Sequence, residues 1–204
     1  MSSEPEAVRA FEHAGWERAA SSYANSFAHA TAPYIVPLLE AAGISAGQHV
    51  LDVACGPGDL GAAASARGAT AHGLDFSAEM VGIARSVHPD VVVTEGDAED
   101  LPYPDRTFHA VVSGFGVHHV PRPELALSEC RRVLKPGGRM AFTVWAAPEE
   151  NTAWSLVFDA IARHGNRSAS KAPPPGALNQ INQCVTLLEA AAFADSSAEI
   201  VRSE

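Results

Sequence analysis

Cationic side chains are scarce in this sequence, and long apolar runs are missing. The 204 residues include 14 Lys and Arg against 24 Asp and Glu, a formal net charge of −10 with histidine neutral. A protein that holds a nucleic-acid backbone needs a cationic surface, so we expect no nucleic-acid partner. No run approaches the roughly 20 apolar residues of a membrane-spanning helix, and the acidic residues 1–6 lack a secretory signal pattern. We therefore expect a cytoplasmic protein without a membrane span.

Cysteine is also rare. The three cysteines, Cys55, Cys130 and Cys184, are scattered without the spacing of metal ligands, and their number is odd. This argues against a disulfide framework, and we expect no metal site. Cys55 stands in a glycine-rich stretch, where we expect a small apolar side chain packed behind a turn rather than a reactive thiol.

The most informative stretch is residues 50–61, an apolar strand that runs through Gly56 and Gly58 into an alanine-rich helix. Glycine lets the backbone approach a ligand closely, and the free N–H groups at the helix start point to the same place. Asp75 ends the next apolar segment, 19 residues after Gly56 (75 − 56). An acid at this distance can accept hydrogen bonds from both hydroxyls of a ribose. The pattern predicts a site for an adenosine cofactor.

The glycine pattern is shared with dinucleotide-binding proteins. Residues 56–61 satisfy G-x-G-x-x-G, the motif of nicotinamide and flavin cofactors. Asp52 and Asp59 flank the turn, however, and would repel a pyrophosphate, while Pro57 removes an N–H group that a phosphate needs. S-adenosylmethionine carries an ammonium and a sulfonium, which acidic side chains attract. We favour this cofactor, and an NAD(P)-dependent oxidoreductase is the alternative.

Five segments in order resemble the class I S-adenosylmethionine-dependent methyltransferases, in particular the branch with the ubiquinone and menaquinone C-methyltransferases. They lie within about residues 16–146 and are residues 50–61, 73–80, 96–103, 108–113 and 132–139. The resemblance implies transfer of a methyl group to the oxygen, nitrogen or carbon of a small organic acceptor, with S-adenosylhomocysteine as the product. It also implies a Rossmann-like α/β fold, a doubly wound, mostly parallel sheet in three layers. A catalytically weak or inactive module that binds the cofactor is a second interpretation.

The alternation of strands and helices favours the same fold. Short apolar strands separated by helical segments are typical of βαβ units, which build a parallel sheet with helices on both faces. The strands are expected at residues 49–54, 70–74, 91–95, 109–113 and 139–144, and the helices at 59–67, 77–87 and 123–134. Residues 134–138 are expected to form a structural turn into the fifth strand.

We expect a single domain over residues 1–204, with its cofactor-binding core at 43–146. Residues 1–42 have a helical pattern and are expected to form a lid. Tyr23 and Phe27, four residues apart, share one face of this lid. They either close over the cofactor or simply cover the sheet.

The last part of the chain, residues 147–204, is expected to cover the acceptor. It is predicted to contain a helix with Trp154, Phe158 and Ile161, a loop at 164–176, a helix at 182–192 and a strand at 198–202. The family pairs this last strand with one more, which this sequence lacks. We therefore expect a truncated domain or an incomplete sheet edge, and such an edge is a route to homodimerisation.

Ligands of doubly wound sheets lie beyond the carboxyl ends of the strands, and each strand here ends in a polar or glycine-rich tip. The tip of the first strand is expected to hold the methionine end of S-adenosylmethionine. The tip of the fourth strand is expected to pass under its sulfonium. The residues concerned are Asp52, Ala54 through its carbonyl, Gly56, Gly58, Ser113 and Gly114.

The second and third tips are expected to hold the adenosine. After the second strand, Asp75 takes the ribose and Phe76 packs on the adenine. After the third, the resemblance implies that Asp97 accepts a hydrogen bond from the adenine amino group and that the Ala98 N–H donates to a ring nitrogen. The alternative interpretation makes Asp75 a helix cap and Asp97 a turn cap.

Methyl transfer is an in-line displacement at an activated sulfonium, so alignment and the exclusion of water matter more than catalytic side chains. A phenol, an enol or a ring carbon nevertheless benefits from a base. His118 and His119 follow the fourth strand, and we predict His118 as that base. In the alternative, this histidine pair only shapes the pocket.

Overall fold

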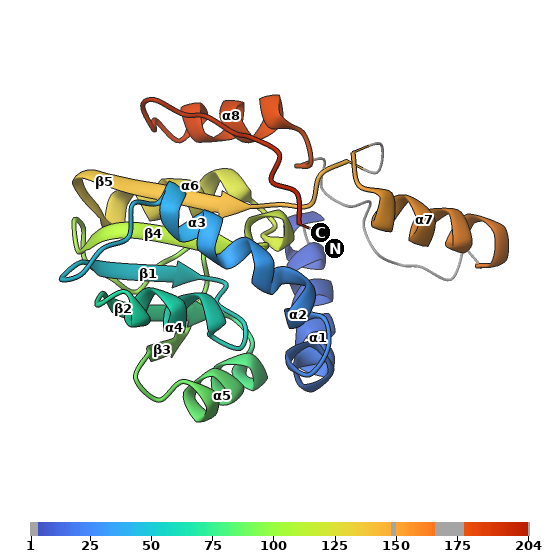
Figure 1. Cartoon of the computed structure of the whole chain (residues 1–204), viewed down its shortest axis with the longest axis horizontal. Coiled ribbons are helices and arrows are strands. Elements are labelled where there is room, and N and C mark those ends of the chain that lie inside the picture. The colour runs from blue at the N-terminus through green and yellow to red at the C-terminus, as the bar shows by residue number, and fades with distance from the viewer. Residues whose placement is uncertain (1–3, 148–149, 166–177, 204) are drawn as a thin grey trace.

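A five-stranded parallel sheet forms the centre of the protein (Figure 1). The computed structural model describes residues 4–147, 150–165 and 178–203. In the order in which they lie side by side, the strands are β3 (Val92–Glu95), β2 (Thr70–Asp75), β1 (His49–Val53), β4 (Phe108–Gly114) and β5 (Leu134–Thr143). Every neighbouring pair is parallel. The predicted α/β fold is confirmed, and the first four strands lie within about one residue of their predicted bounds.

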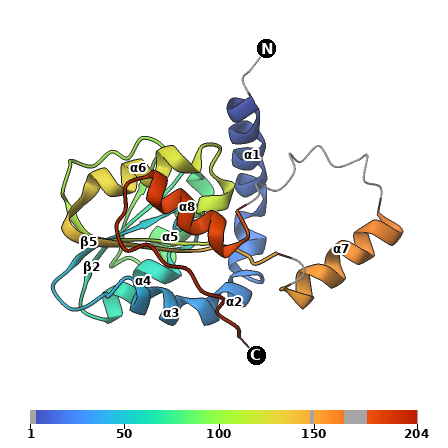
Figure 2. The same ribbon diagram turned by 90° about the horizontal axis from the view of Figure 1, so that it is seen from above.

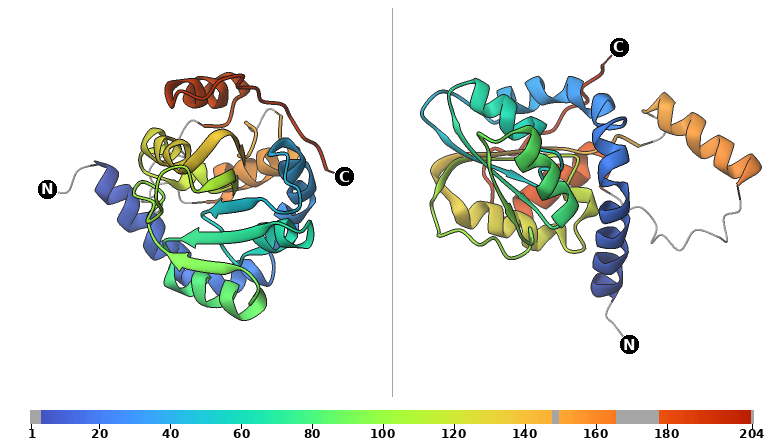
Figure 3. Two further views of the ribbon diagram at one scale, coloured as in Figure 1. Left: turned by 90° about the vertical axis from the view of Figure 1, so that its left-hand side faces the viewer. Right: turned by 90° about the horizontal axis from the view of Figure 1, so that it is seen from below.

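Helices cover both faces of this sheet, which gives three layers (Figure 3). One face packs against α3 (Ile35–Ala41), α4 (Asp59–Ala66) and α5 (Ala78–Val87). The other packs against α6 (Pro123–Val133), and α8 (Ile181–Ala190) lies on α6. Because both faces are covered, β1 and β4 in the middle of the sheet are almost entirely buried.

Strand β1 shows how the sequence produces this arrangement. Successive side chains of a strand point to opposite faces, so Val50 enters the core on the α3–α5 side and Leu51 the core on the α6 side. Both side chains are fully buried. The acidic residue of this strand, Asp52, is also buried. Burying a carboxylate costs free energy that apolar packing does not return.

The N-terminal part lies across the edge at which the strands end (Figure 2). Helix α1 (Glu4–Ala24) crosses this edge, and α2 (Ala28–Thr31) and the 3-10 turn η1 (Ala32–Tyr34) lead back to α3. The carboxyl ends of the strands are therefore covered by α1.

Helix α7 (Thr152–His164), which was predicted from its apolar positions, projects away from the sheet in Figures 1 and 2.

The start of β5 differs from the prediction. Residues 134–138, expected to be a turn, belong to the strand: Leu134 pairs with Phe108, and after a register shift Arg139 pairs with Ala110. An irregularity of this kind absorbs extra residues without ending the strand.

The strand predicted at residues 198–202 is also wrong, since this segment has no strand partner. It is held by side chains instead, because Arg202 pairs with Glu150 (Nη2–Oε2 3.1 Å) and the Ser203 hydroxyl donates to Tyr34 (2.9 Å). An extended segment becomes a strand only when a neighbouring backbone pairs with it. Most of the loop predicted at 164–176 lies outside the described residues.

Gly116 lies where the segment after β4 passes the end of β1. A methyl group on Gly116 would meet the Ala54 Cβ at 2.5 Å and the Ser113 Oγ at 2.7 Å. We expect Gly116→Ala to lower the free energy of unfolding by about 1–3 kcal/mol, because the two segments must move apart. In the matched control Gly114→Ala, the new methyl group would meet Leu60 at an ordinary 3.5 Å. Urea unfolding compares the two variants, and equal stability would contradict the tight contact.

Candidate active site

The turn after β1 is built from left-handed backbone. Ala54, Gly56 and Gly58 have φ angles of +57°, +52° and +91°. The Gly58 N–H donates to the Cys55 carbonyl (3.0 Å), which closes the turn at the start of α4. Ala54 adopts this conformation despite its Cβ, and such strain concentrates at functional sites. The turn presents backbone rather than side chains at the carboxyl edge of the sheet.

Asp52 is a carboxylate buried near the end of β1, with 1% of its surface exposed. Its Oδ2 accepts a hydrogen bond from the Gly61 N–H (3.1 Å), while its buried Oδ1 has no partner among the described residues. Burial raises the pKa of Asp52 well above its ordinary value, and the carboxylates of Asp75 and Asp59 raise it further. A cation would stabilise this buried anion.

Asp75, at the end of β2, ties the turn to the neighbouring strand. Its Oδ2 accepts a hydrogen bond from the Gly56 N–H (2.8 Å) and its Oδ1 from the Ser77 N–H (2.9 Å). Burial raises the pKa of Asp75, against the lowering effect of these N–H groups. Ser77, rather than Asp75, caps α5, since its hydroxyl accepts from the Met80 N–H (3.2 Å). The helix-cap interpretation of Asp75 is therefore wrong.

A cavity of about 540 Å³ lies between α1 and the ends of β2 and β3. It is lined by Glu6, Arg9, Ala10, His13, Phe76, Glu95, Gly96 and Asp97. The Phe76 ring meets His13 of α1 edge to face, 5.4 Å between centroids, and Arg9 forms an ion pair with Asp97. Phe76 and Asp97 thus share one cavity, whereas the Ala98 side chain lies in the core.

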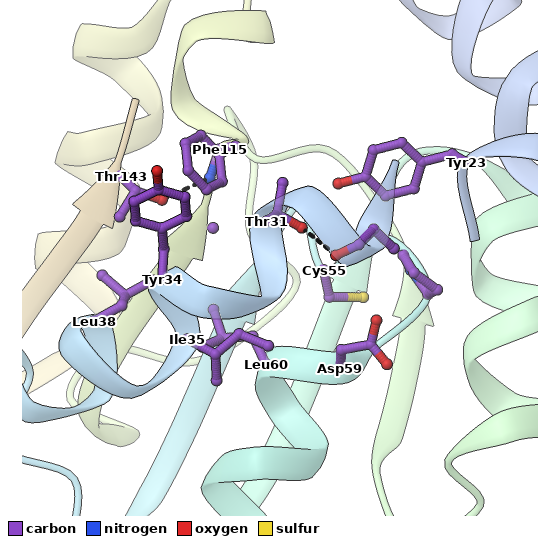
Figure 4. A pocket seen from close by; sticks show the side chains of 13 residues that line it. Tyr23, Thr31, Tyr34, Ile35, Leu38, Cys55, Asp59, Leu60, Phe115 and Thr143 are labelled. Carbon is purple, nitrogen blue, oxygen red and sulfur yellow. Dashed lines mark hydrogen bonds between the residues drawn. The ribbon is translucent and has the colours of Figure 1, made fainter. Parts of the chain in front are cut away.

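A second cavity adjoins the turn on the side of β4 (Figure 4). Its labelled lining residues are Tyr23, Thr31, Tyr34, Ile35, Leu38, Cys55, Asp59, Leu60, Phe115 and Thr143. Gly114 and Pro57 also line it, whereas Ser113 is fully buried and its hydroxyl has no partner among the described residues. Phe27 lies against Tyr23, 5.9 Å between centroids. Cys55 and Pro57 thus bring the glycine turn into the wall of this second cavity.

The profile of one protein family, described as a methyltransferase domain, matches residues 51–142. The solved structure of a candidate methyltransferase from Bacillus halodurans superposes with a TM-score of 0.61 at 30% identity, and the match covers 78% of this chain and 68% of that one. The chain belongs to the class I S-adenosylmethionine-dependent methyltransferase family.

Two curated relatives of this chain are named demethylmenaquinone methyltransferase. The protein from Chlorobaculum tepidum is 48% identical over 90 residues, which are 44% of this chain and 37% of that protein. The protein from Renibacterium salmoninarum is 38% identical over 137 residues, 65% of this chain and 58% of that protein. The chain thus spans less than two thirds of either relative.

The predicted base, His118, lies in the 3-10 turn η2 (Val117–His119) after β4. Burial lowers the pKa of His118 to about 3, and the neighbouring His119 contributes to this shift. The His118 Nδ1 is buried without a partner in the described part of the chain. An imidazole with so low a pKa holds a proton weakly, which weighs against His118 as the base, and its role stays a prediction.

Two side chains of α1 that reach the strand ends were not predicted. Arg9 pairs with Asp97 and also with Glu99 (Nη2–Oε2 2.7 Å). Glu12 accepts a hydrogen bond from the His119 ring (Nδ1–Oε2 3.0 Å). Neither has a sequence signal, because a charged residue on a helix does not reveal which element lies opposite.

Three further observations concern the Cys55 thiol, possible metal ligands and the lengths of the helices. Cys55 is buried in the core behind the turn, and burial raises the pKa of its thiol well above the ordinary value, so that the thiolate is disfavoured. Among the described residues, His, Cys, Asp and Glu form no cluster arranged for a metal. The helices in the same part of the chain are too short or too polar to cross a membrane.

Proposed function

We propose that this chain binds S-adenosylmethionine at the ends of β1–β4 and transfers its methyl group to a small organic acceptor. The observation that carries this proposal is the buried carboxylate of Asp52, whose Oδ1 lacks a partner among the described residues. It lies beside a turn with left-handed backbone and close to a second acid, Asp75. This arrangement suits the cationic methionine end and disfavours a pyrophosphate.

The methionine end would bind at the glycine turn. Asp52 and the Ala54 carbonyl attract its ammonium, and Gly56 and Gly58 let the backbone approach closely. The Asp75 carboxylate takes the ribose hydroxyls. Each of its oxygens accepts one backbone N–H already and keeps a lone pair for a hydroxyl.

The adenine would occupy the cavity under α1. Phe76 packs on its ring, Asp97 accepts from its amino group and the Ala98 N–H donates to a ring nitrogen. Arg9 already pairs with Asp97, so the adenine either shares this carboxylate with Arg9 or displaces it. Helix α1 also excludes bulk water, which displacement at the sulfonium requires.

The acceptor would lie beyond Ser113 and Gly114, next to aromatic side chains. Phe115 and Trp145 stack with 4.2 Å between centroids, and Tyr34 meets Phe115 edge to face at 5.5 Å. Such rings favour a flat, apolar acceptor. The names of the relatives, demethylmenaquinone methyltransferase, agree with a quinone precursor, and a polyketide offers the same chemistry.

Calorimetric titration with S-adenosylmethionine, S-adenosylhomocysteine and NAD tests this proposal. We expect micromolar dissociation constants for the first two ligands and no binding of NAD. Radiolabelled methyl transfer to a panel of phenols, quinols, thiols and amines then tests catalysis. Binding without transfer to any acceptor would favour a cofactor-binding module, and binding of NAD alone would overturn the proposal.

A further inference from the structure

Aromatic rings from separate segments form a continuous row around the end of β4. Neighbouring centroids lie between 4.2 and 5.9 Å apart. In order, the rings are His119, Trp16, Tyr23, Phe27, Trp145, Phe115 and Tyr34. His119 and Phe115 belong to the segment that follows β4, Trp16 and Tyr23 belong to α1, and Trp145 follows β5. The row therefore joins these three segments beside the end of β4, where the acceptor is proposed to bind.

His119 is oriented within this row by a carboxylate. The Glu12 Oε2 lies 3.0 Å from the His119 Nδ1 and also accepts a hydrogen bond from the Trp16 indole N–H (3.1 Å). The Trp16 ring meets the His119 ring edge to face, 5.1 Å between centroids. The Glu12 carboxylate thus holds both rings in place.

The carboxylate also selects the tautomer of His119. Because an ionised carboxylate only accepts, the hydrogen lies on Nδ1 and Nε2 keeps its lone pair. This Nε2 has no hydrogen-bond partner in the described parts of the chain, and the His119 side chain is 33% exposed. The other ionisable group that contacts the ring is His118, 4.2 Å away between centroids.

We propose that the His119 Nε2 takes the acceptor's proton during methyl transfer and that Glu12 is its positioning residue. This inference rests on the proposed function. The acceptor O–H bond breaks and its proton passes to Nε2. The oxygen lone pair forms the new bond to the methyl carbon, and the electron pair of the sulfur–methyl bond stays on sulfur, which becomes a neutral thioether. Glu12 stabilises the imidazolium that forms.

Nitrogen NMR of histidine-labelled protein, saturated with S-adenosylhomocysteine, tests the dyad without an acceptor. The His119 signal, assigned with His119→Gln, should show the Nδ1–H tautomer near neutral pH. Glu12→Gln should shift the population toward the Nε2–H tautomer, because the neutral amide selects the Nδ1 proton less strongly. An Nε2–H tautomer in the parent protein, or no response to Glu12→Gln, would overturn the proposal.

Labelled methyl transfer to the phenols of the panel, from about pH 6 to about pH 9, tests the proton transfer. We expect His119→Gln to lower turnover about 100-fold or more near neutral pH, with a rate that rises with pH as free phenolate replaces the base. Glu12→Gln should also lower turnover near neutral pH, by a smaller factor, and should give the same rise of turnover with pH. The affinity for S-adenosylhomocysteine should stay within about twofold in both variants.

His29→Gln, which changes an exposed imidazole whose Nδ1 lies 3.1 Å from the Ser26 carbonyl oxygen, is the matched control. His118→Gln examines the competing base. Loss of turnover in His118→Gln with full turnover in His119→Gln would overturn the proposal. If the parent protein methylates nothing on the panel, the proposed function fails, and the tautomer of His119 still decides whether the dyad exists.

Discussion

Replacing Asp75 with alanine is expected to lower the affinity for S-adenosylmethionine and S-adenosylhomocysteine about 100-fold or more. The carboxylate is proposed to hold two ribose hydroxyls, and each charge-assisted hydrogen bond contributes about 1.5–3 kcal/mol. It also accepts the N–H groups of Gly56 and Ser77, so its removal releases the glycine turn as well. Isothermal titration calorimetry measures the affinity, and urea unfolding measures the accompanying loss of stability, about 1–3 kcal/mol.

Two further variants separate the ribose contact from the support of the turn. Asp75→Asn keeps the shape and one acceptor but removes the charge, so it should lose affinity while retaining more stability than the alanine variant. Asp90→Ala removes an exposed acid and should change neither quantity. Unchanged affinity in a folded Asp75→Ala protein would show that this carboxylate only links the two strands.

Asp52→Asn is expected to stabilise the free protein and weaken cofactor binding at the same time. Burial raises the folded-state pKa of Asp52 above its unfolded value, so the folded state holds a proton more tightly than the unfolded chain. The stability from this difference is present at low pH and is lost as the pH rises through the folded-state pKa. Asparagine has no such loss, so the stability advantage of the variant should grow with pH.

The size of the stability change in Asp52→Asn depends on the Asp52 Oδ1, which has no partner among the described residues. At about pH 8 we expect the variant to be more stable by about 1–3 kcal/mol, with a smaller difference near pH 5. The affinity for S-adenosylmethionine should fall about 10-fold to 100-fold, because the buried anion no longer attracts the ammonium. Urea unfolding at both pH values and calorimetry measure these changes.

Lower stability of Asp52→Asn at both pH values would contradict the proposal. It would show that the Asp52 Oδ1 has a donor partner, such as a water molecule, that an amide NH2 cannot replace. A gain in stability together with a loss of binding would instead identify Asp52 as a residue retained for its ligand at the expense of the fold.

The positions of the strand ends could be predicted from the sequence. Each strand is a short apolar run followed by a polar or glycine tip, and the parallel βαβ order brings these tips to one edge. For this reason Asp52, Asp75 and Asp97 could be placed at one edge from their positions alone. Their roles toward a cofactor stay predictions.

The segment after β4 shows where such reasoning fails. His118 and His119 are adjacent and chemically identical, yet burial lowers the pKa of His118 to about 3, while His119 contacts Glu12. Glu12 lies 107 residues away in the chain. No local pattern connects them, because the contact depends on how α1 crosses the sheet edge.

The C-terminal strand prediction fails for a related reason. Residues 198–202 have the composition of a strand, but a strand needs a neighbouring backbone to pair with. In the structure these residues are held by contacts of Arg202 and Ser203. Residues 134–138 show the opposite case, since Leu134 and Arg139 pair with β4 on either side of a register shift, and the strand continues despite two glycines and a proline.

The sequence by itself determined the α/β class, the parallel order of the strand and helix segments and the position of the acidic tips, because hydrophobic periodicity and turn residues act over a few neighbours. Only the tertiary structure decided which histidine contacts Glu12, that Arg9 and Glu12 of α1 reach the strand ends, and which extended segments are strands. These outcomes depend on burial and on pairing between residues far apart in the chain, which local patterns do not encode.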